Sequence, residues 1–243
     1  MRRAAVTAQA RVETTLTLRR GESLLATLGI PVGVLVFFST LDVIDTGLAD
    51  DLDFLVPGVL ALAVMATAMV SLGIATGFER RYGVLKRLGT TPLGRGGLVL
   101  AKTVSVLAVE AIQLAVIIAV AVALGWDATT RLAPAAGFLA LGTVAFAGLG
   151  LLMAGALRAE LTLALTNTLY VGFLLFGGVA VPLDRLPGPA EALARLTPGA
   201  QLVATVRGAL TAGAGIPTWA WAGLLVWAVL APIAAAALFR WEE

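Results

Sequence analysis

The sequence predicts an all-α membrane protein with six transmembrane helices. Hydrophobic residues make up 59% of the 243 residues, charged residues make up 13%, and the mean hydropathy is +0.96. Charged residues account for about 25% of an average soluble domain. A soluble fold of this length could not bury so much apolar surface, so lipid is the expected solvent.

Six apolar stretches are candidates to cross the bilayer, because a membrane helix needs about 20 apolar residues to cover about 30 Å of hydrocarbon. Pro31 is expected to kink the first of them, and the three residues 158–160 between the fourth and fifth predict a tight turn. We expect a connecting segment at 1–21 and a six-span domain at 22–243. The predicted spans are 22–41, 54–76, 98–125, 134–157, 161–181 and 219–239.

The distribution of positive charge predicts the orientation of the spans. With six spans and both ends on one side, thirteen Lys and Arg side chains fall on that side and four on the other. The stretch 42–53, on the poorer side, carries five Asp and no Lys or Arg. The positive-inside rule therefore places both termini in the cytoplasm. The basic N-terminal region is too long for a cleaved signal peptide, and the Arg-, Ala- and Gly-rich composition favours the inner (plasma) membrane of a bacterium.

The chain has no Cys and no His. Disulfides, thiol nucleophiles, the usual zinc sites and a histidine base are therefore excluded. Clustered acids are also lacking, so we expect no catalytic site, metal or cofactor in the chain itself, and no nucleic-acid partner.

One stretch imitates a phosphate-binding loop. Residues 96–103, GGLVLAKT, depart from the pattern G-x-x-x-x-G-K-[ST] only at Ala101. No strand precedes the stretch, and its amides are expected to be committed to the third span. We therefore expect no ATP binding there, and we expect the ammonium of Lys102 to reach the lipid head groups.

The stretch GFERRYGVLKRLGTTPLGR, residues 77–95, separates the second and third spans and holds six charged side chains. Wound as one helix over 79–89, it has an apolar face with Tyr82, Leu85 and Leu88, and Gly89 is its natural end. Arg80 and Arg87 lie opposite that face, with Glu79 and Lys86 between. A two-sided helix suits docking on another protein, and the alternative is a basic loop that serves only the topology.

The string FERRYGVLKRLGTTPLGRGGLVLAK resembles the most recognisable segment of the ABC type-2 permease family, the membrane subunits of one class of ATP-driven exporters. The segment LPGPAEALARLTPGAQLVATVRGAL, residues 186–210, resembles the family's external segment between spans five and six. The residues that match the family's first pattern in place are Glu79, Gly83, Leu85, Leu88, Pro92, Leu93 and Lys102.

The resemblance implies half of an exporter. A second permease copy, expected as a homodimer, and two copies of a cytoplasmic ABC ATPase that binds ATP and Mg²⁺ would complete it. Residues 1–21 would form an amphipathic connecting helix, and the segment between spans five and six a partly re-entrant cap. Residues 79–89 would be the coupling helix, with ATPase contacts from Glu79, Arg80, Tyr82, Leu85, Lys86, Arg87 and Leu88.

The resemblance also suggests a cargo pathway lined by the second and fifth spans. The candidate contacts are Met65, Met69, Asn167, Tyr170 and Phe173. Thioether and aromatic groups favour an amphiphilic or hydrophobic cargo, such as a drug, an antibiotic or a membrane lipid, moved out of the cytoplasm or inner leaflet.

Glu110 is a further candidate for the pathway, about 18 Å beyond Leu98 along the third span. An acid at such depth is costly, so a functional role is one hypothesis and pairing within the bundle, with Gln113 nearby, is the other. Two rival functions stay open: a proton-coupled carrier that uses Glu110, and a scaffold that transports nothing.

Overall fold

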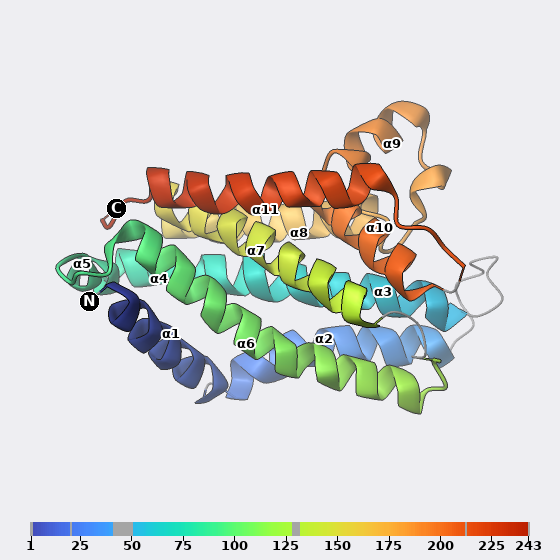
Figure 1. Ribbon diagram of the computed structural model, residues 1–243, viewed down its shortest axis with the longest axis horizontal. Coiled ribbons are helices and arrows are strands. Elements are labelled where there is room, and N and C mark those ends of the chain that lie inside the picture. The colour runs from blue at the N-terminus through green and yellow to red at the C-terminus, as the bar shows by residue number, and fades with distance from the viewer. Residues whose placement is uncertain (1, 20, 41–50, 128–131, 212, 243) are drawn as a thin grey trace.

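The computed structural model describes residues 2–19, 21–40, 51–127, 132–211 and 213–242. All the regular structure in these ranges is helical, which confirms the all-α class. The long helices lie side by side in one bundle (Figure 1). In chain order the elements are α1 Arg2–Arg19, α2 Gly21–Thr40, α3 Asp51–Val64, the π-helix η1 Met65–Ser71, α4 Leu72–Arg81, α5 Val84–Gly89, α6 Gly94–Ala123, α7 Leu132–Ala156, α8 Ala159–Phe176, the 3-10 helix η2 Leu183–Arg185, α9 Gly188–Arg195, α10 Pro198–Leu210 and α11 Thr218–Leu238.

Among the described residues, five helices are long and apolar enough to cross a membrane, and each overlaps a predicted span. The first is the continuous helix Leu52–Arg81, made of α3, η1 and α4, and the others are α6, α7, α8 and α11. The predicted first span falls on α2, whose described apolar part, Leu28–Ser39, is shorter than a span. The count of six and the orientation of the termini therefore stay predictions, and most of the Asp-rich stretch 42–53 lies outside the described residues.

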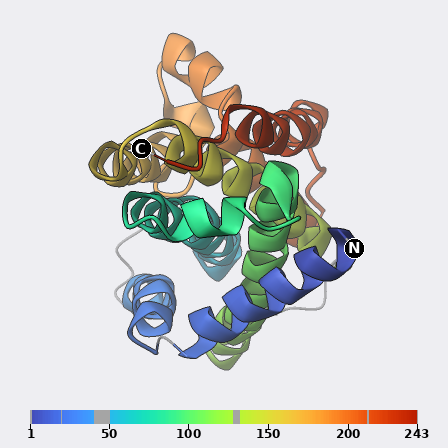
Figure 2. The same ribbon diagram turned by 90° about the vertical axis from the view of Figure 1, so that its left-hand side faces the viewer.

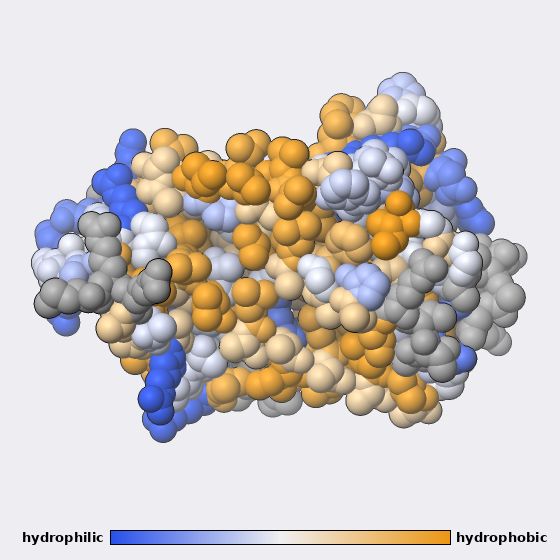
Figure 3. All heavy atoms as spheres, in the orientation of Figure 1, coloured by the Kyte–Doolittle hydropathy of each residue, from blue (hydrophilic) through white to orange (hydrophobic). Residues whose placement is uncertain are grey.

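The surface of the bundle is that of a multi-pass membrane protein. Hydrophobic residues form a band around the middle, and hydrophilic residues gather mainly at the two ends (Figure 3). Large apolar side chains are exposed along α6, α8 and α11, among them Leu100, Val171 and Leu230. Lipid, rather than water, is the solvent that makes such exposure favourable.

The core is centred on α7, which lies between the helix Leu52–Arg81 and α11. Glycines allow both contacts: a Cβ added to Gly150 would lie 2.7 Å from the Met69 carbonyl oxygen, and one added to Gly148 would lie 2.5 Å from the Pro232 nitrogen. No side chain fits at these approaches. The backbone contact with Gly150 falls within η1, a seven-residue π-helical segment of a kind that is frequent at functional sites.

α1 crosses the end of the bundle and packs on α6 (Figure 2). A helix therefore forms where the connecting helix was expected, and Val6 near its start packs on an apolar cluster of the bundle, but two larger apolar side chains further along are exposed. Val12 and Leu16 are 53% and 49% exposed, whereas the small Ala10 is buried. Polar contacts must therefore add to the apolar contacts of Val6 and Ala10 in holding α1 in place.

Candidate functional site

The predicted coupling segment, residues 79–89, consists of two pieces. α4 ends at Arg81 and α5 begins at Val84. Gly83 between them has a φ of +74°, in the left-handed region that glycine adopts at little cost, and its N–H donates to the Arg80 carbonyl at 3.0 Å. The expectation of one continuous helix over 79–89 is therefore wrong, because a glycine cap ends the long helix inside it.

The exposure of two side chains before the break differs from the prediction. Arg80, expected opposite the apolar face, is 4% exposed, and its Nη2 donates to the Leu157 carbonyl at 2.5 Å. Tyr82, expected on the apolar face, is 73% exposed. Arg80 thus fastens the end of α4 to the turn between α7 and α8, while Tyr82 is open to a partner.

α5 is anchored to the bundle by one leucine. Leu85 has no exposed surface, and it belongs to a small apolar cluster separate from the main core. The other buried members of this cluster are Leu93, Leu98 and Phe239, and Leu88 packs against it. Leu93 leads into α6, Leu98 lies on it and Phe239 follows α11, so movement of α5 must displace the ends of two spans.

The residues after α11 complete the anchor. A Cβ added to Gly89 would lie 3.2 Å from the Trp241 ring, so this indole packs directly on the end of α5. Lys86 Nζ lies 3.1 Å from Glu242 Oε1. These contacts could not be predicted from the sequence, because they join segments more than 150 residues apart.

The outward side of α5 and the turn before it carries two apolar and two basic side chains. Tyr82, Val84, Lys86 and Arg87 are all exposed. They lie at the extreme end of the bundle, beside the start of α1 and the end of α11 (Figure 1). Such a surface complements a partner groove with an apolar floor and an acidic rim.

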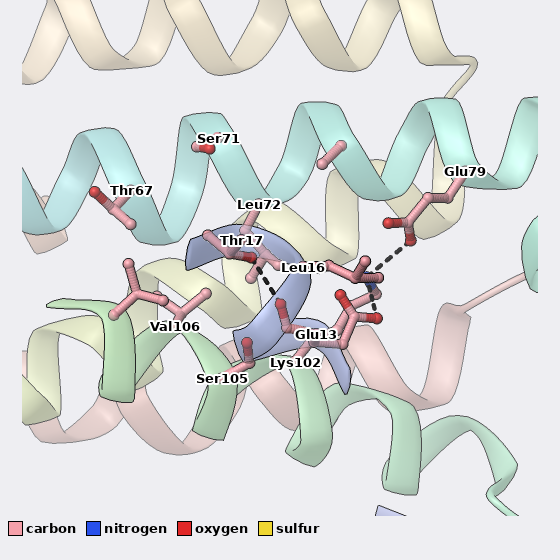
Figure 4. A pocket seen from close by; sticks show the side chains of 12 residues that line it. Glu13, Leu16, Thr17, Thr67, Ser71, Leu72, Glu79, Lys102, Ser105 and Val106 are labelled. Carbon is pink, nitrogen blue, oxygen red and sulfur yellow. Dashed lines mark hydrogen bonds and ion pairs between the residues drawn. The ribbon is translucent and has the colours of Figure 1, made fainter. Parts of the chain in front are cut away.

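Lys102 lies on α6, one turn after Leu98, and connects α6 to α1 and α4. Its Nζ lies 2.8 Å from Glu79 Oε2 and 3.0 Å from Glu13 Oε1 (Figure 4). The lysine side chain is 1% exposed, and the two carboxylates are 24% and 17% exposed. The expectation that Lys102 reaches the head groups is therefore wrong, because carboxylates on α1 and α4 neutralise its ammonium inside the protein. We call Glu13, Glu79 and Lys102 the Lys102 cluster.

Polar side chains around the Lys102 cluster fix the position of α1. Gln9 Nε2 donates to Glu13 Oε1 at 2.8 Å. The hydroxyls of Thr14 on α1 and Ser105 on α6 lie 3.2 Å apart. A small cavity of about 90 Å³ adjoins the cluster and reaches Thr67 on η1. α1 is therefore held to the spans by ion pairs and hydrogen bonds.

Sequence reasoning missed Glu13 and the burial of Lys102, although a signal was present. The chain has two lysines, and one of them lies within an apolar helix. A cation inside a span requires a counter-charge or a route to water. The need for a partner was thus predictable. Its identity was not, because Glu13 reaches Lys102 only through the packing of α1 across α6.

The predicted cargo contacts are not brought together in one place. Met65 and Met69 are fully buried in the main core. Asn167 and Tyr170 line a cavity of about 200 Å³ that also touches α2 and the helix Leu52–Arg81. Phe173 packs edge-on against Phe146, with ring centroids 5.8 Å apart. Contact of these residues with cargo stays a prediction.

Glu110 has one partner in the bundle, and this partner is not Gln113. Its side chain is 1% exposed, and its Oε2 contacts the Thr143 hydroxyl on α7. Gln113 instead accepts a hydrogen bond from Thr67 at 2.9 Å. Glu110 Oε1 has no hydrogen-bond partner within the part of the chain that the structure describes. One carboxylate oxygen in the middle of α6 is therefore left unsatisfied.

The segment between α8 and α11 is helical, as expected. Thr197 caps α10: its Oγ1 accepts from the Ala200 N–H at 3.3 Å, and Pro198 takes the first helical position. α10 packs into the bundle, whereas α9 projects from it (Figure 1). The external and re-entrant character of this segment stays a prediction.

Arg207 fixes α10 to its neighbours. Its guanidinium lies 4.0 Å from the centroid of the Phe54 ring, and its Nη2 donates to the Gly178 carbonyl at 3.0 Å. Burial lowers the pKa of Arg207 to about 10, and the charge of Asp184 opposes this shift. The side chain therefore keeps its positive charge at neutral pH.

The sequence matches a known protein family. The sequence model of the family described as ABC-2 type transporter matches residues 6–211. This range begins within α1 and ends just after α10, so it includes the Lys102 cluster, the coupling segment and the α9–α10 region. A search of curated proteins found no match.

Proposed function

Because this chain belongs to the ABC-2 type transporter family, we propose that it is the permease subunit of an ATP-driven exporter. Members of the family generally work with an ABC ATPase partner. A second copy of the chain, forming a homodimer, and two ATPase subunits that bind ATP and Mg²⁺ complete the proposed transporter. Its proposed location is the plasma membrane of a bacterium, with α5 and both termini on the cytoplasmic side.

The observation that carries the proposal is the way α5 is mounted. Tyr82 and Arg87 are exposed for a partner, while Leu85 is buried against residues at the ends of α6 and α11. One turn before the break, Glu79 binds Lys102, and Lys102 binds α1. A force applied to the exposed side is therefore transmitted to α1, α4, α6 and α11 together.

The surface of α8 supports a second copy as the neighbour on that side. Only 17% of this helix is buried, the lowest share among the five long apolar helices. Asn167 and Thr168 are exposed on it among large apolar side chains. Both side chains donate to carbonyls of their own helix, and the amide oxygen of Asn167 can accept a hydrogen bond from a neighbouring helix. The cavity beside Asn167 and Tyr170 then faces the second copy, and its lining favours an amphiphilic or hydrophobic cargo.

Co-purification tests the proposal. The chain is purified from native membranes of its source with a mild detergent, and ATP hydrolysis in the eluate is measured. We expect an ATPase subunit to co-purify with the wild-type chain and to be lost with the double variant Tyr82→Ala, Arg87→Glu, because both changes fall on the exposed side of the coupling segment. Arg185→Glu, an exposed charge reversal in η2, is the matched control and should retain the ATPase.

Two results would contradict the proposal. If the double variant recovered as much ATPase as the wild type, the coupling segment would not be the docking surface. Transport by the purified chain alone, driven by a pH gradient and abolished by Glu110→Gln, would favour the proton-coupled carrier instead.

A further inference from the structure

An apolar cavity of about 400 Å³ lies between α6 and α7. Leu60 of α3 and Leu210 of α10 contribute to its lining. Around its opening the side chains are small and exposed, namely Ala111 and Ala115 on α6 and Ala136 and Ala140 on α7. The cavity is therefore open to the outside of the bundle between α6 and the first half of α7, and its volume falls within the usual range for small-molecule sites.

Glu110 lines this cavity and is the one ionisable side chain among the described residues that do so. It is 1% exposed, and its Oε1 has no hydrogen-bond partner. Such an oxygen in apolar surroundings costs free energy unless a donor reaches it. The protein supplies one polar partner to this carboxyl, Thr143, and leaves room for a second at Oε1.

The hydrogen bonds of the Thr143 hydroxyl indicate where the proton lies between Thr143 and the Glu110 carboxyl. Thr143 Oγ1 lies within hydrogen-bonding distance of both Glu110 Oε2 and the Leu139 carbonyl. A hydroxyl has one proton, so it can donate to only one of them at a time. When it donates to Leu139, the contact with Glu110 requires a proton on the carboxyl. A neutral acid is also the form that an apolar cavity favours.

We propose that this cavity binds a lipophilic amine, with the ligand nitrogen on Glu110 and its hydrocarbon body along the alanines and leucines. A neutral amine that arrives through the bilayer takes the proton from the Glu110 carboxyl. The resulting ammonium and carboxylate then form an ion pair, and no net charge enters the apolar cavity. The ammonium supplies the donor that Oε1 lacks, and its bond to the carboxylate is charge-assisted.

The cavity selects against other apolar ligands by the same chemistry. A hydrocarbon chain without a nitrogen fills the volume but leaves Oε1 unsatisfied. An alcohol can donate one hydrogen bond but cannot form the ion pair. A fatty acid would place its own carboxyl beside that of Glu110, and two acids cannot form an ion pair. This selection deepens the proposed function by naming a ligand class, and it rests on that function only for the step from binding to export.

Equilibrium binding to the full chain in lipid nanodiscs, without ATP or ATPase, tests the proposal. The probes are radiolabelled dodecylamine and its uncharged analogue dodecanol, with binding to empty nanodiscs subtracted. We expect saturable dodecylamine binding to the wild type that is at least about tenfold tighter than dodecanol binding, as charged hydrogen bonds contribute more than neutral ones. Glu110→Gln should abolish this preference, while Glu191→Gln, the same change on a partly exposed acid of α9 outside the cavity, should keep it.

A second variant tests the cavity without changing the Glu110 carboxyl. Ala136→Leu narrows the opening and retains Glu110, so it should weaken dodecylamine binding by a similar factor. Size-exclusion chromatography identifies a variant that fails to fold. Equal affinity for the amine and the alcohol, or unchanged amine binding in Ala136→Leu or Glu110→Gln, overturns the site. Because no ATPase is present, amine binding can succeed while ATPase co-purification fails, or the reverse, and the two proposals are judged separately.

Discussion

Lys102 and Glu110 lie eight residues apart on α6 and are both 1% exposed, yet their surroundings differ. Lys102 has two carboxylates within 3.0 Å, and these come from two other helices. Glu110 has one hydroxyl and an open apolar cavity. A buried charge with a complete set of partners joins helices, whereas one with an incomplete set is available for a ligand. α6 thus carries near its start a lysine, Lys102, that links it to α1 and α4, and near its middle a candidate ligand-binding group, Glu110.

The largest expected effect is that of Lys102→Met. This change leaves Glu13 and Glu79 close together without a cation, and breaking a buried ion pair in this way costs about 3–5 kcal/mol. We expect a clear fall in the thermal unfolding temperature of the purified chain. Lys86→Met, which removes the exposed pair with Glu242, is the matched control and should cost at most about 1 kcal/mol. Equal effects of the two changes would show that burial of Lys102 carries no special weight.

A rescue variant sharpens this result. Adding Glu13→Gln and Glu79→Gln to Lys102→Met removes the repulsion between the two acids and leaves neutral groups that can still form hydrogen bonds. We expect the triple variant to recover about 2 kcal/mol of the loss, since uncompensated charge is the main cost of breaking a pair. The thermal unfolding of the wild type, Lys86→Met, Lys102→Met and the triple variant is compared in the same detergent. No recovery in the triple variant would indicate that lost packing of the lysine stem causes the destabilisation.

Glu110→Leu should have the opposite sign. Leucine removes the unsatisfied oxygen and places apolar atoms at the cavity, so stability should rise by about 1 kcal/mol. The thermal unfolding temperature is again the measurement. A fall as large as that of Lys102→Met would mean that Glu110 joins helices as Lys102 does, and the contrast between the two sites would disappear.

The smallest effect concerns the break that separates α4 from α5. Gly83→Ala forces a side chain into a left-handed backbone and should cost about 1 kcal/mol. Gly96→Ala, in the regular part of α6 with open space around it, should be neutral or slightly stabilising. Hydrogen exchange of residues 80–90 locates the effect, and we expect faster exchange there in Gly83→Ala alone. Equal exchange in both variants would contradict a break at Gly83 and would support a continuous helix over this segment.

The sequence predicted the spans well because their signal is local. Composition and run length located five apolar helices, each of which overlaps a predicted span, and the Thr197–Pro198 start of α10 followed from local capping chemistry. The coupling segment was predicted less well. Helical winding over 79–89 placed Arg80 outward, whereas Arg80 continues the buried stripe of α4 with Thr76 and Gly77, and Gly83 ends that helix before Leu85. A periodicity argument assumes a continuous helix, so it fails wherever a cap interrupts one.

By itself the sequence determined the solvent, the helical class, the approximate limits of the long helices and the ABC-2 resemblance, because apolar content, run length and short motifs are properties of contiguous residues. Only the tertiary structure decided that Lys102 is neutralised by Glu13 and Glu79, that Arg80 is buried, and that Glu110 meets Thr143 beside a cavity. These contacts join helices far apart in the chain. The free energy of a buried charge depends on which groups packing brings within a few ångströms, and no local pattern of residues specifies that.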